Sequence, residues 1–253
     1  MPSSHSRAGW SADITLRVRR HFALKLIGTT AVTGLFLIAY LYMLHHPAHA
    51  VTVMPLTAFD RLIPFQPQAL FVYVSLWLYV GVGPGLQLNL LELLVYGLWM
   101  AAMCLCGLAF FYFWPTQVPP LQLDVSSFPG FAMLQGVDAA GNACPSMHVA
   151  AATFTIVRVS QVLRQASAPI LLRVFNAAWF AAIVFSTLAI KQHVVLDAVA
   201  GAFLGVAFAL PSLRWRPSAA AGTRTADPRE TMVNASARES GVSRGAPSQG
   251  LNA

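Results

Sequence analysis

Residues 89–114 read NLLELLVYGLWMAAMCLCGLAFFYFW, a stretch that contains one charged residue, Glu92. About 20 consecutive apolar residues are enough for a helix to cross the hydrocarbon core of a bilayer. A single acidic residue near the start of such a helix suits the positive end of the helix dipole. The stretch therefore predicts a transmembrane helix that begins near Asn89 and ends near Trp114.

Similar apolar blocks occur on both sides of this stretch. We expect them to form helices at about residues 22–44, 67–82, 146–163, 170–190 and 192–210, with Gly83-Pro84-Gly85 closing the second. The sequence thus predicts an all-α fold, a bundle of six transmembrane helices over residues 22–210. Residues 1–21 precede it, and residues 211–253, which are rich in Ser, Ala, Gly, Pro and Arg, are expected to be a disordered tail.

The overall composition excludes a water-soluble globular domain. Of the 253 residues, 57% are hydrophobic and only 10% are charged, whereas soluble domains carry about 25% charged residues. The net charge of +7 does not indicate nucleic-acid binding, because the basic residues flank the apolar blocks and form no single patch. We therefore expect membrane lipids and no nucleic acid as partners.

The placement of Lys and Arg predicts the orientation of the bundle. Basic residues are frequent before the first predicted span, around the connection between the fourth and fifth, and after the sixth: Arg7, Arg17, Arg19, Arg20, Arg158, Arg164, Arg173, Arg214, Arg216, Arg224, Arg229, Arg238 and Arg244. With six spans, all three segments lie on one side, which the positive-inside rule assigns to the cytoplasm. We expect both termini in the cytoplasm, and the loops 45–66 and 115–145 outside a plasma membrane such as the bacterial inner membrane.

Three ionisable residues begin two of the predicted spans. His148 begins the fourth span, and His193 and Asp197 begin the sixth. Ionisable groups at membrane depth are costly and usually functional, and the predicted topology brings these three to the same outer end. The spacing of His193 and Asp197 places them on one helix face, where the carboxylate can orient the imidazole and leave its other nitrogen free as a nucleophile or base. A purely structural hydrogen bond at the helix start is the alternative.

Two further residues are candidates for holding an anion. Ser146 follows Pro145 at a predicted helix start, where exposed backbone N–H groups favour a negative charge; a simple N-cap is the alternative role. Lys191 lies two residues before His193 and either binds phosphate or reaches towards the membrane surface. The three cysteines show no metal-ligand spacing, so we expect neither a metal nor a cofactor.

These residues together resemble the type 2 phosphatidic acid phosphatase and haloperoxidase superfamily. The family's second motif, Pro-Ser-x-His, is matched by residues 145–148. Its third motif is Ser-Arg, five residues, His, three residues, Asp, and residues 186–197 match it except that Thr187 replaces the Arg. The first motif, Lys, six residues, Arg-Pro, is missing, because residues 114–120 read WPTQVPP.

Within that superfamily, the chain looks most similar to the branch that contains inositol phosphorylceramide synthases, including the stretch Ile63-Pro64-Phe65-Gln66-Pro67 followed by Tyr73. The resemblance implies that His193 attacks phosphorus to form a phosphohistidine, that Asp197 orients it, and that His148 protonates the leaving oxygen. It also implies a phosphate site at Ser146 and the start of the fourth span.

The chemistry that the resemblance implies leaves alternatives open. Transfer of a phospho-headgroup and hydrolysis of phosphatidic acid or an isoprenyl phosphate differ only in the second substrate. A non-catalytic transporter or scaffold of the same fold is the third possibility. Because the basic residues of the first and third motifs are absent, we expect a phosphodiester, which carries less charge than a phosphomonoester, to be preferred. The oligomeric state and the identity of the lipid are left open.

Overall fold

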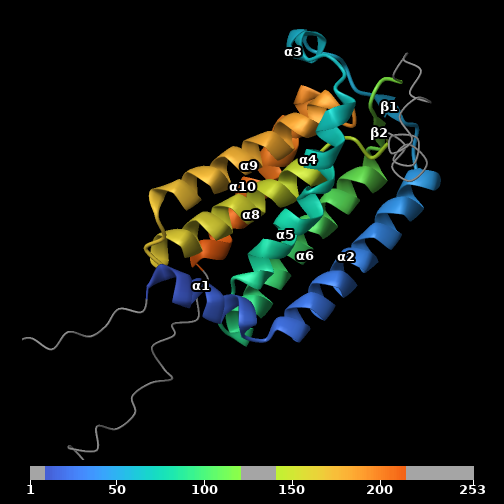
Figure 1. Cartoon of the computed structure of the whole chain (residues 1–253). Coiled ribbons are helices and arrows are strands. Elements are labelled where there is room, and N and C mark those ends of the chain that lie inside the picture. The colour runs from blue at the N-terminus through green and yellow to red at the C-terminus, as the bar shows by residue number, and fades with distance from the viewer. Residues whose placement is uncertain (1–8, 121–140, 215–253) are drawn as a thin grey trace, which may run out of the picture. The chain divides into compact units, whose positions relative to one another are not determined.

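The computed structural model describes residues 9–120 and 141–214, which form a bundle of helices lying side by side (Figure 1). The elements are α1 (Trp10–Arg19), α2 (Phe22–His45), β1 (Thr52–Val53), α3 (Ala58–Leu62), η1 (Pro67–Ala69), α4 (Leu70–Val74), α5 (Leu76–Gly85), α6 (Leu90–Phe113), β2 (Thr116–Gln117), α8 (Met147–Gln165), α9 (Ile170–Ala189) and α10 (Val195–Arg214). The expected helical bundle is confirmed, with two short strands added to it.

Within residues 9–120 and 141–214, five segments are long and apolar enough to cross a membrane. They are Phe22–His45, Pro67–Gly85, Leu90–Phe113, Ile170–Ala189 and Val195–Arg214. Five of the six predicted spans are thus found, and the chain is an integral membrane protein. The predicted fourth span corresponds to α8, which does not meet the same criterion of length and composition, so the count of six stays a prediction.

The position of α8 explains why it can be less apolar than its neighbours. It packs against α10, α9 and α5, and eleven of its nineteen residues are buried. Thr153, Thr155 and Arg158 are among them. A helix that is covered by other helices does not need an apolar surface toward lipid, so its sequence loses the hydropathy signal of a span.

The second predicted span is less regular than expected and also longer. It consists of η1, α4 and α5, and α5 continues through Gly83 and Pro84 to Gly85 instead of ending at Val82. Pro84 has no N–H and so removes one helical hydrogen bond, but it lies one residue before the end of the helix, where little of the helix remains to be disrupted. Gly83 allows close packing, since a Cβ atom at this position would overlap the hydroxyl group of Tyr96 on α6.

The helix α2 is fastened to the bundle near its two ends. Near its start, the Lys25 ammonium group donates hydrogen bonds to the carbonyl oxygens of Arg17 (2.6 Å) and Gly85 (2.8 Å). Near its end, the carbonyl oxygen of Tyr40 accepts a hydrogen bond from the Asn142 side chain at 3.0 Å. Lys25 and Tyr40 are the two buried residues of this helix, and the residues between them are half-buried or exposed.

The segments outside the predicted spans also contain ordered structure. The helix α1 lies within the predicted N-terminal segment 1–21, for which no helix was expected. Strands β1 and β2 pair in parallel, with Thr52 opposite Thr116 and Val53 opposite Gln117, which joins the predicted outer loops. The helix α10 extends to Arg214, four residues beyond the predicted end of the sixth span. The remainder of the expected disordered tail lies outside the described residues.

Arg158 lies inside the bundle, although the sequence suggested an anchor at the cytoplasmic membrane surface. Its guanidinium group donates hydrogen bonds to the Ser212 carbonyl oxygen (3.0 Å) and to the Gln87 side chain (3.1 Å), and it lies over the Tyr96 ring. Along α8 it lies ten residues after His148, which corresponds to about 15 Å of helix. Arg158 therefore joins α8 to α10 and to the end of α5, far from the candidate site.

Candidate active site

The site is built where the starts of α8 and α10 meet. The Ser146 backbone N–H donates a hydrogen bond to the Asp197 carbonyl oxygen at 3.0 Å, which joins the two starts directly. Gly201, one turn further along α10, allows this approach, because a Cβ atom there would overlap the Ser146 carbonyl oxygen. Two segments about 50 residues apart in sequence are thereby held in fixed register, and their polar side chains meet.

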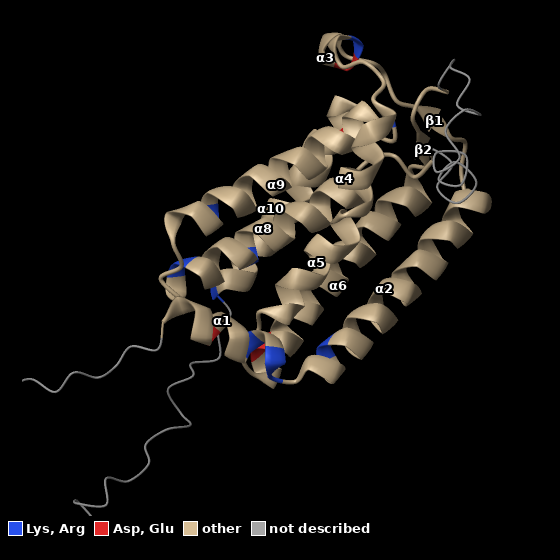
Figure 2. Cartoon of the chain, in the orientation of Figure 1, with Lys and Arg blue, Asp and Glu red and all other residues tan. Residues whose placement is uncertain are grey.

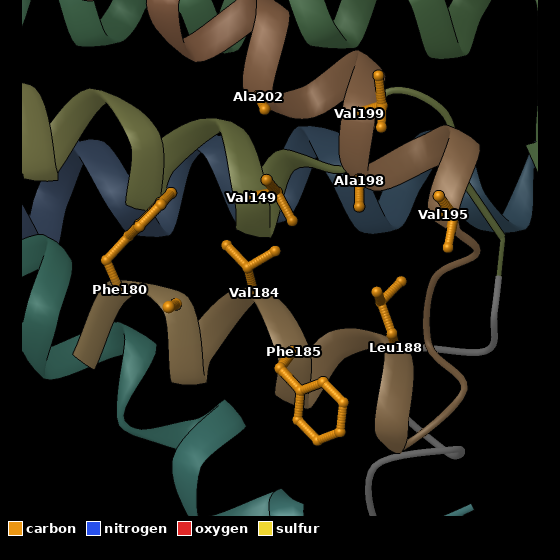
Figure 3. Close-up of a pocket in the computed structure, with 10 residues that line it drawn as sticks. Val149, Phe180, Val184, Phe185, Leu188, Val195, Ala198, Val199 and Ala202 are labelled. Carbon is orange, nitrogen blue, oxygen red and sulfur yellow. The ribbon is translucent and has the colours of Figure 1, made fainter. Parts of the chain in front are cut away.

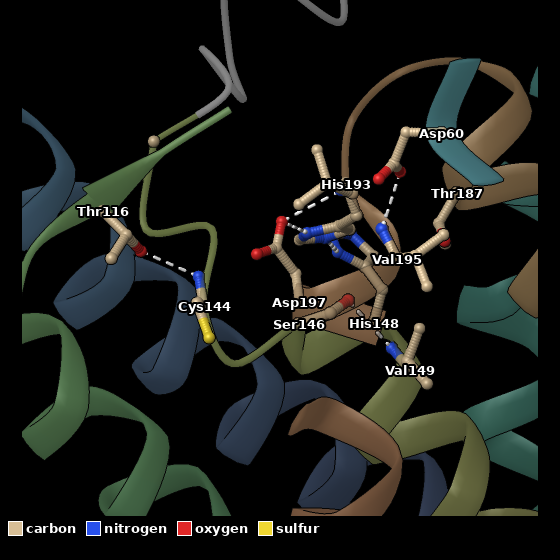
Figure 4. A network of polar contacts seen from close by, with 12 residues as sticks. Asp60, Thr116, Cys144, Ser146, His148, Val149, Thr187, His193, Val195 and Asp197 are labelled. Carbon is tan, nitrogen blue, oxygen red and sulfur yellow. Dashed lines mark hydrogen bonds and ion pairs between the residues drawn. The ribbon is translucent and has the colours of Figure 1, made fainter. Parts of the chain in front are cut away.

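The three residues expected from the sequence lie in one row (Figure 4), and Tyr73 extends the row at the His148 end. The Tyr73 hydroxyl group on α4 is 2.7 Å from Nε2 of His148. Nδ1 of His148 is 3.2 Å from Nε2 of His193. Nδ1 of His193 in turn lies 3.6 Å from Oδ2 of Asp197. The row therefore runs from Tyr73 through both imidazoles to the carboxylate.

One assignment of protons places a donor against an acceptor in both hydrogen bonds of the row, with both imidazoles neutral. If Nδ1 of His193 carries its proton toward Asp197, then Nε2 of His193 has a lone pair and accepts from Nδ1–H of His148. Nε2 of His148 then accepts from the Tyr73 hydroxyl group. In this arrangement Nε2 is the atom of His193 that carries the lone pair, so it is the nitrogen that can act as a nucleophile or base.

The carboxylate of Asp197 is completely buried, and His193 is 6% exposed. Oδ2 of Asp197 accepts a hydrogen bond from the Val194 backbone N–H at 3.0 Å, at the start of α10. At 3.6 Å the separation from His193 Nδ1 is longer than a hydrogen bond. The expected orienting contact is thus present as a close approach, which a displacement of a few tenths of an ångström would convert into a hydrogen bond.

Ser146 lies beside the row, but its polar atoms are used within the protein. It is fully buried, and its Oγ accepts a hydrogen bond from the Val149 backbone N–H at 3.3 Å. Its own N–H is bonded to Asp197, as described above. The geometry therefore shows an N-cap, and direct binding of phosphate by this hydroxyl group stays a prediction.

Lys191 is turned toward the loop that carries α3 and does not join the row. Its ammonium group donates hydrogen bonds to the carbonyl oxygens of Asp60 (3.1 Å) and Ile63, and Lys191 itself has a left-handed backbone conformation, with φ of 59°. Burial lowers the pKa of Lys191, and the nearby Asp60 carboxylate partly offsets this shift. Lys191 thus holds the loop that carries α3.

The loop that carries α3 also contains an acidic residue, Asp60. Its carboxylate accepts hydrogen bonds from the Thr57 backbone N–H and hydroxyl group (2.7 and 2.6 Å) and from the Val195 backbone N–H (2.8 Å). Figure 4 shows its carboxylate directed at Val195, close to His193. A second carboxylate therefore lies at the start of α10, in addition to that of Asp197.

Cys144 is not available as a nucleophile. Burial raises the pKa of its thiol to about 11, and the charge of Asp197 adds to the shift. A thiol with this pKa is protonated near neutral pH, and the thiolate is the reactive form. The Cys144 backbone N–H donates a hydrogen bond to the Thr116 hydroxyl group at 2.8 Å. This bond attaches the residues before α8 to β2, which follows α6.

Two apolar grooves lie near the row. The first, with a volume of about 490 Å³, is bordered by residues of α8, α9 and α10, including Val149, Val184, Leu188 and Ala202 (Figure 3). The second, of about 260 Å³, is bordered by α2, α4, α5, α6 and α8, and both Tyr73 and His148 contribute to its wall. The second groove thus reaches the row of polar residues.

Tyr73 and Asp60 are the contacts that sequence reasoning missed as site residues. Tyr73 lies in an apolar segment at the same end of the bundle as His148. The histidines were selected because they are ionisable groups at membrane depth, and the same argument would also have selected Tyr73. Asp60 is an acidic residue in a loop predicted to lie outside, but nothing in the sequence relates it to Val195. Its contact depends on how the α3 loop folds back.

The fold and the site together define a class of protein: a helical membrane protein with a half-buried histidine, a buried histidine and a buried carboxylate at two neighbouring helix starts. A family model described as the PAP2 superfamily matches residues 65–210, which is more than half of the chain, and the chain belongs to this superfamily. Searches of curated proteins and of solved structures found no match. Membership indicates phosphoesterase activity on lipid substrates.

Proposed function

We propose that this protein is a membrane phosphoesterase or phosphotransferase that acts on a lipid phosphate through a phosphohistidine at His193. The observation that carries the proposal is the row from His148 through His193 to Asp197. Both histidines are positioned by the starts of α8 and α10, and one nitrogen of each faces the other at 3.2 Å. A phosphorus atom bound to Nε2 of His193 would replace this contact and lie beside the second imidazole.

The proposed reaction has two steps. In the first, Nε2 of His193 attacks phosphorus, the bond between phosphorus and the leaving oxygen breaks, and protonated His148 gives a proton to that oxygen. In the second, His148 removes a proton from water or from an alcohol, whose oxygen attacks phosphorus and displaces His193. Asp197 stabilises the positive charge that His193 carries while it is bonded to phosphorus. Water gives hydrolysis, and a lipid or sugar alcohol gives transfer.

The charges around the row favour a substrate phosphate with one negative charge. Thr187 occupies the position of the family's Arg in the third motif, and the Lys191 ammonium group is bound to loop carbonyl oxygens. The carboxylates of Asp60 and Asp197 lie on the same side of the bundle as His193. Like charges disfavour a second negative charge on phosphate. A phosphodiester headgroup is therefore proposed over a phosphomonoester such as phosphatidic acid.

The outward orientation of the site is part of the proposal. Figure 2 shows most of the described Lys and Arg residues near the end of the bundle that contains α1 and the connection from α8 to α9, opposite to α3. The positive-inside rule assigns that end to the cytoplasm. The row of site residues, at the other end, would then face outward with both termini in the cytoplasm.

The test is turnover of lipids labelled with radioactive phosphorus by the purified protein in lipid nanodiscs. We expect wild type to cleave a phosphodiester lipid faster than phosphatidic acid, and we expect label on the protein after an alkaline quench, which preserves phosphohistidine. His193→Ala should remove both turnover and labelling. Gly97→Ala, whose added Cβ atom would meet no heavy atom within 4 Å, is the control for handling. Labelled protein with His193→Ala, or turnover without His193, would overturn the assignment of the nucleophile.

A further inference from the structure

The groove that reaches His148 has features of a site for a hydrocarbon chain. Its wall is formed mainly by apolar side chains of five helices, listed here: Val32, Thr33, Phe36, Leu37, Tyr40, Leu41, Tyr73, Leu76, Trp77, Val80, Met100, Cys104, Met147, His148 and Ala151. Tyr73 and His148, which hydrogen-bond each other, belong both to this wall and to the row. An amphiphile in this groove would thus have its apolar part along α5 and its polar part at His148.

The way in which α2 is attached explains why a groove exists at this place. The helix is bonded to its neighbours near Lys25 and near Tyr40, and these two residues are about 22 Å apart at 1.5 Å per residue. Between them every residue of α2 is exposed or half-buried. A Cβ atom at Gly28 or Gly34 would meet no heavy atom within 4 Å. The middle of α2 therefore leaves space on the side of α5 and α6.

In a bilayer this space is filled by hydrocarbon, because apolar cavities hold no ordered water. We propose that the groove between α2 and α5 binds one hydrocarbon chain of the lipid substrate and brings its phosphate to the row. This inference rests on the proposed function, and it adds the route of entry and the part of the lipid that is recognised. The other groove has only apolar residues in its wall and contains no residue of the row, so it is the matched comparison.

The contribution of this groove is orientation more than affinity. A lipid tail is already in an apolar environment, so moving it from the bilayer into the groove gains little from the hydrophobic effect. Holding the tail along α5 instead limits the positions of the phosphate relative to His193, and such positioning can account for large rate effects. A short, water-soluble phosphoester has no tail to be held and depends on the row alone.

The first experiment measures occupancy and does not need turnover. A phospholipid with a photoreactive diazirine at the end of one acyl chain is added to wild type and to His193→Ala in nanodiscs, and labelled peptides are identified by mass spectrometry. We expect labelling of α2 and α5 that excess unlabelled phospholipid reduces. Labelling confined to α8, α9 and α10, or labelling that competitor leaves unchanged, would overturn the proposal even if the protein is an active phosphoesterase.

The second experiment uses a pair of matched variants. Ala151 and Ala202 are both half-buried alanines in helices, one in the wall of each groove. Ala151→Phe should fill the α2–α5 groove and Ala202→Phe the other one. We expect Ala151→Phe to lower the ratio of long-chain lipid turnover to soluble nitrophenyl phosphodiester turnover by at least about tenfold, and to lower diazirine labelling in parallel. Ala202→Phe should change neither ratio nor labelling by more than about twofold.

Thr33→Phe fills the same groove from α2, far in sequence from His148, and decides the case if Ala151→Phe does not fold. The same fall in ratio and labelling is expected. An unchanged ratio and unchanged labelling in Thr33→Phe, or equal losses in Ala202→Phe, would overturn the groove while leaving the chemistry at His193 in place. If wild type did not turn over the soluble substrate but its groove were labelled as expected, the result would count against the proposed function alone.

Discussion

The hydroxyl group of Tyr73 lies 2.7 Å from Nε2 of His148, and Tyr73 is 2% exposed. This contact fixes the orientation of the imidazole that is proposed to protonate the leaving oxygen. Tyr73 is thus a positioning residue that acts through His148, on a helix that contributes no other residue to the row.

Tyr73→Phe should remove this hydrogen bond without changing the packing of the ring. Since a neutral hydrogen bond contributes about 0.5–1.5 kcal/mol net, we expect turnover to fall about 2- to 12-fold. The loss should grow as the leaving group becomes more basic, because only such substrates need the acid. The measurement is kcat against leaving-group pKa, together with the pH profile. A uniform loss for all leaving groups with an unchanged pH profile would indicate a merely structural tyrosine.

His148→Ala should separate the acid from the nucleophile. Removing the general acid typically costs about 100- to 10,000-fold with a poor leaving group. The nitrophenolate group of a nitrophenyl phosphodiester needs no protonation when it leaves. Formation of phosphorylated His193 from this substrate should therefore be much less affected. Burst kinetics with both substrates measure this difference. Equal losses with both substrates would mean that His148 does something other than protonate the leaving oxygen.

Lys191→Ala tests whether this residue binds phosphate or holds the α3 loop. The bonds to the carbonyl oxygens of Asp60 and Ile63 predict a role in stability, with a loss of about 1–2 kcal/mol for a half-buried charged donor. We expect a lower Tm and an unchanged preference between diester and monoester lipids. Thermal unfolding in detergent and paired rate measurements check this. A large, selective loss of monoester binding at normal Tm would restore the phosphate-binding role.

Gly201→Ala should disturb the site from a position that touches no substrate. The added methyl group would overlap the Ser146 carbonyl oxygen, and overpacking typically costs about 1–3 kcal/mol. The starts of α8 and α10 would move apart, so both Tm and turnover should fall. Gly97→Ala is the matched control, because its Cβ atom meets nothing within 4 Å and alanine favours the helix by about 1 kcal/mol. A Gly201→Ala protein with normal Tm and turnover would show that the close packing is not required.

The sequence was sufficient for the features that have a strong local signal. The apolar blocks located the helices to within a few residues, and the i, i+4 pair on α10 with the Pro-Ser-x-His stretch located three residues of the row. The positions of the helix ends were harder to predict. One example is α5, which continues past Pro84 to Gly85 although proline disfavours a helix interior.

Other features depend on tertiary packing and had no local signal. α8 was predicted as an ordinary span, but its neighbours screen it from lipid, and it therefore carries Arg158 and several hydroxyl groups. The role of Lys191 depends on the fold of the α3 loop, whose carbonyl oxygens happen to lie within its reach. The hydrogen bond of Tyr73 likewise depends on the packing of α4 against α8.

The way that α2 borders the proposed groove has a consequence for how such a protein can diversify. The family match covers residues 65–210, and α2, residues 22–45, lies entirely before it. One wall of the groove therefore comes from outside the part of the chain that carries the reacting residues. Substitutions in α2 can alter which hydrocarbon lengths or degrees of unsaturation are accepted while the phosphorus chemistry stays the same. Exchange of this one helix between related proteins would then transfer tail preference as a separable module.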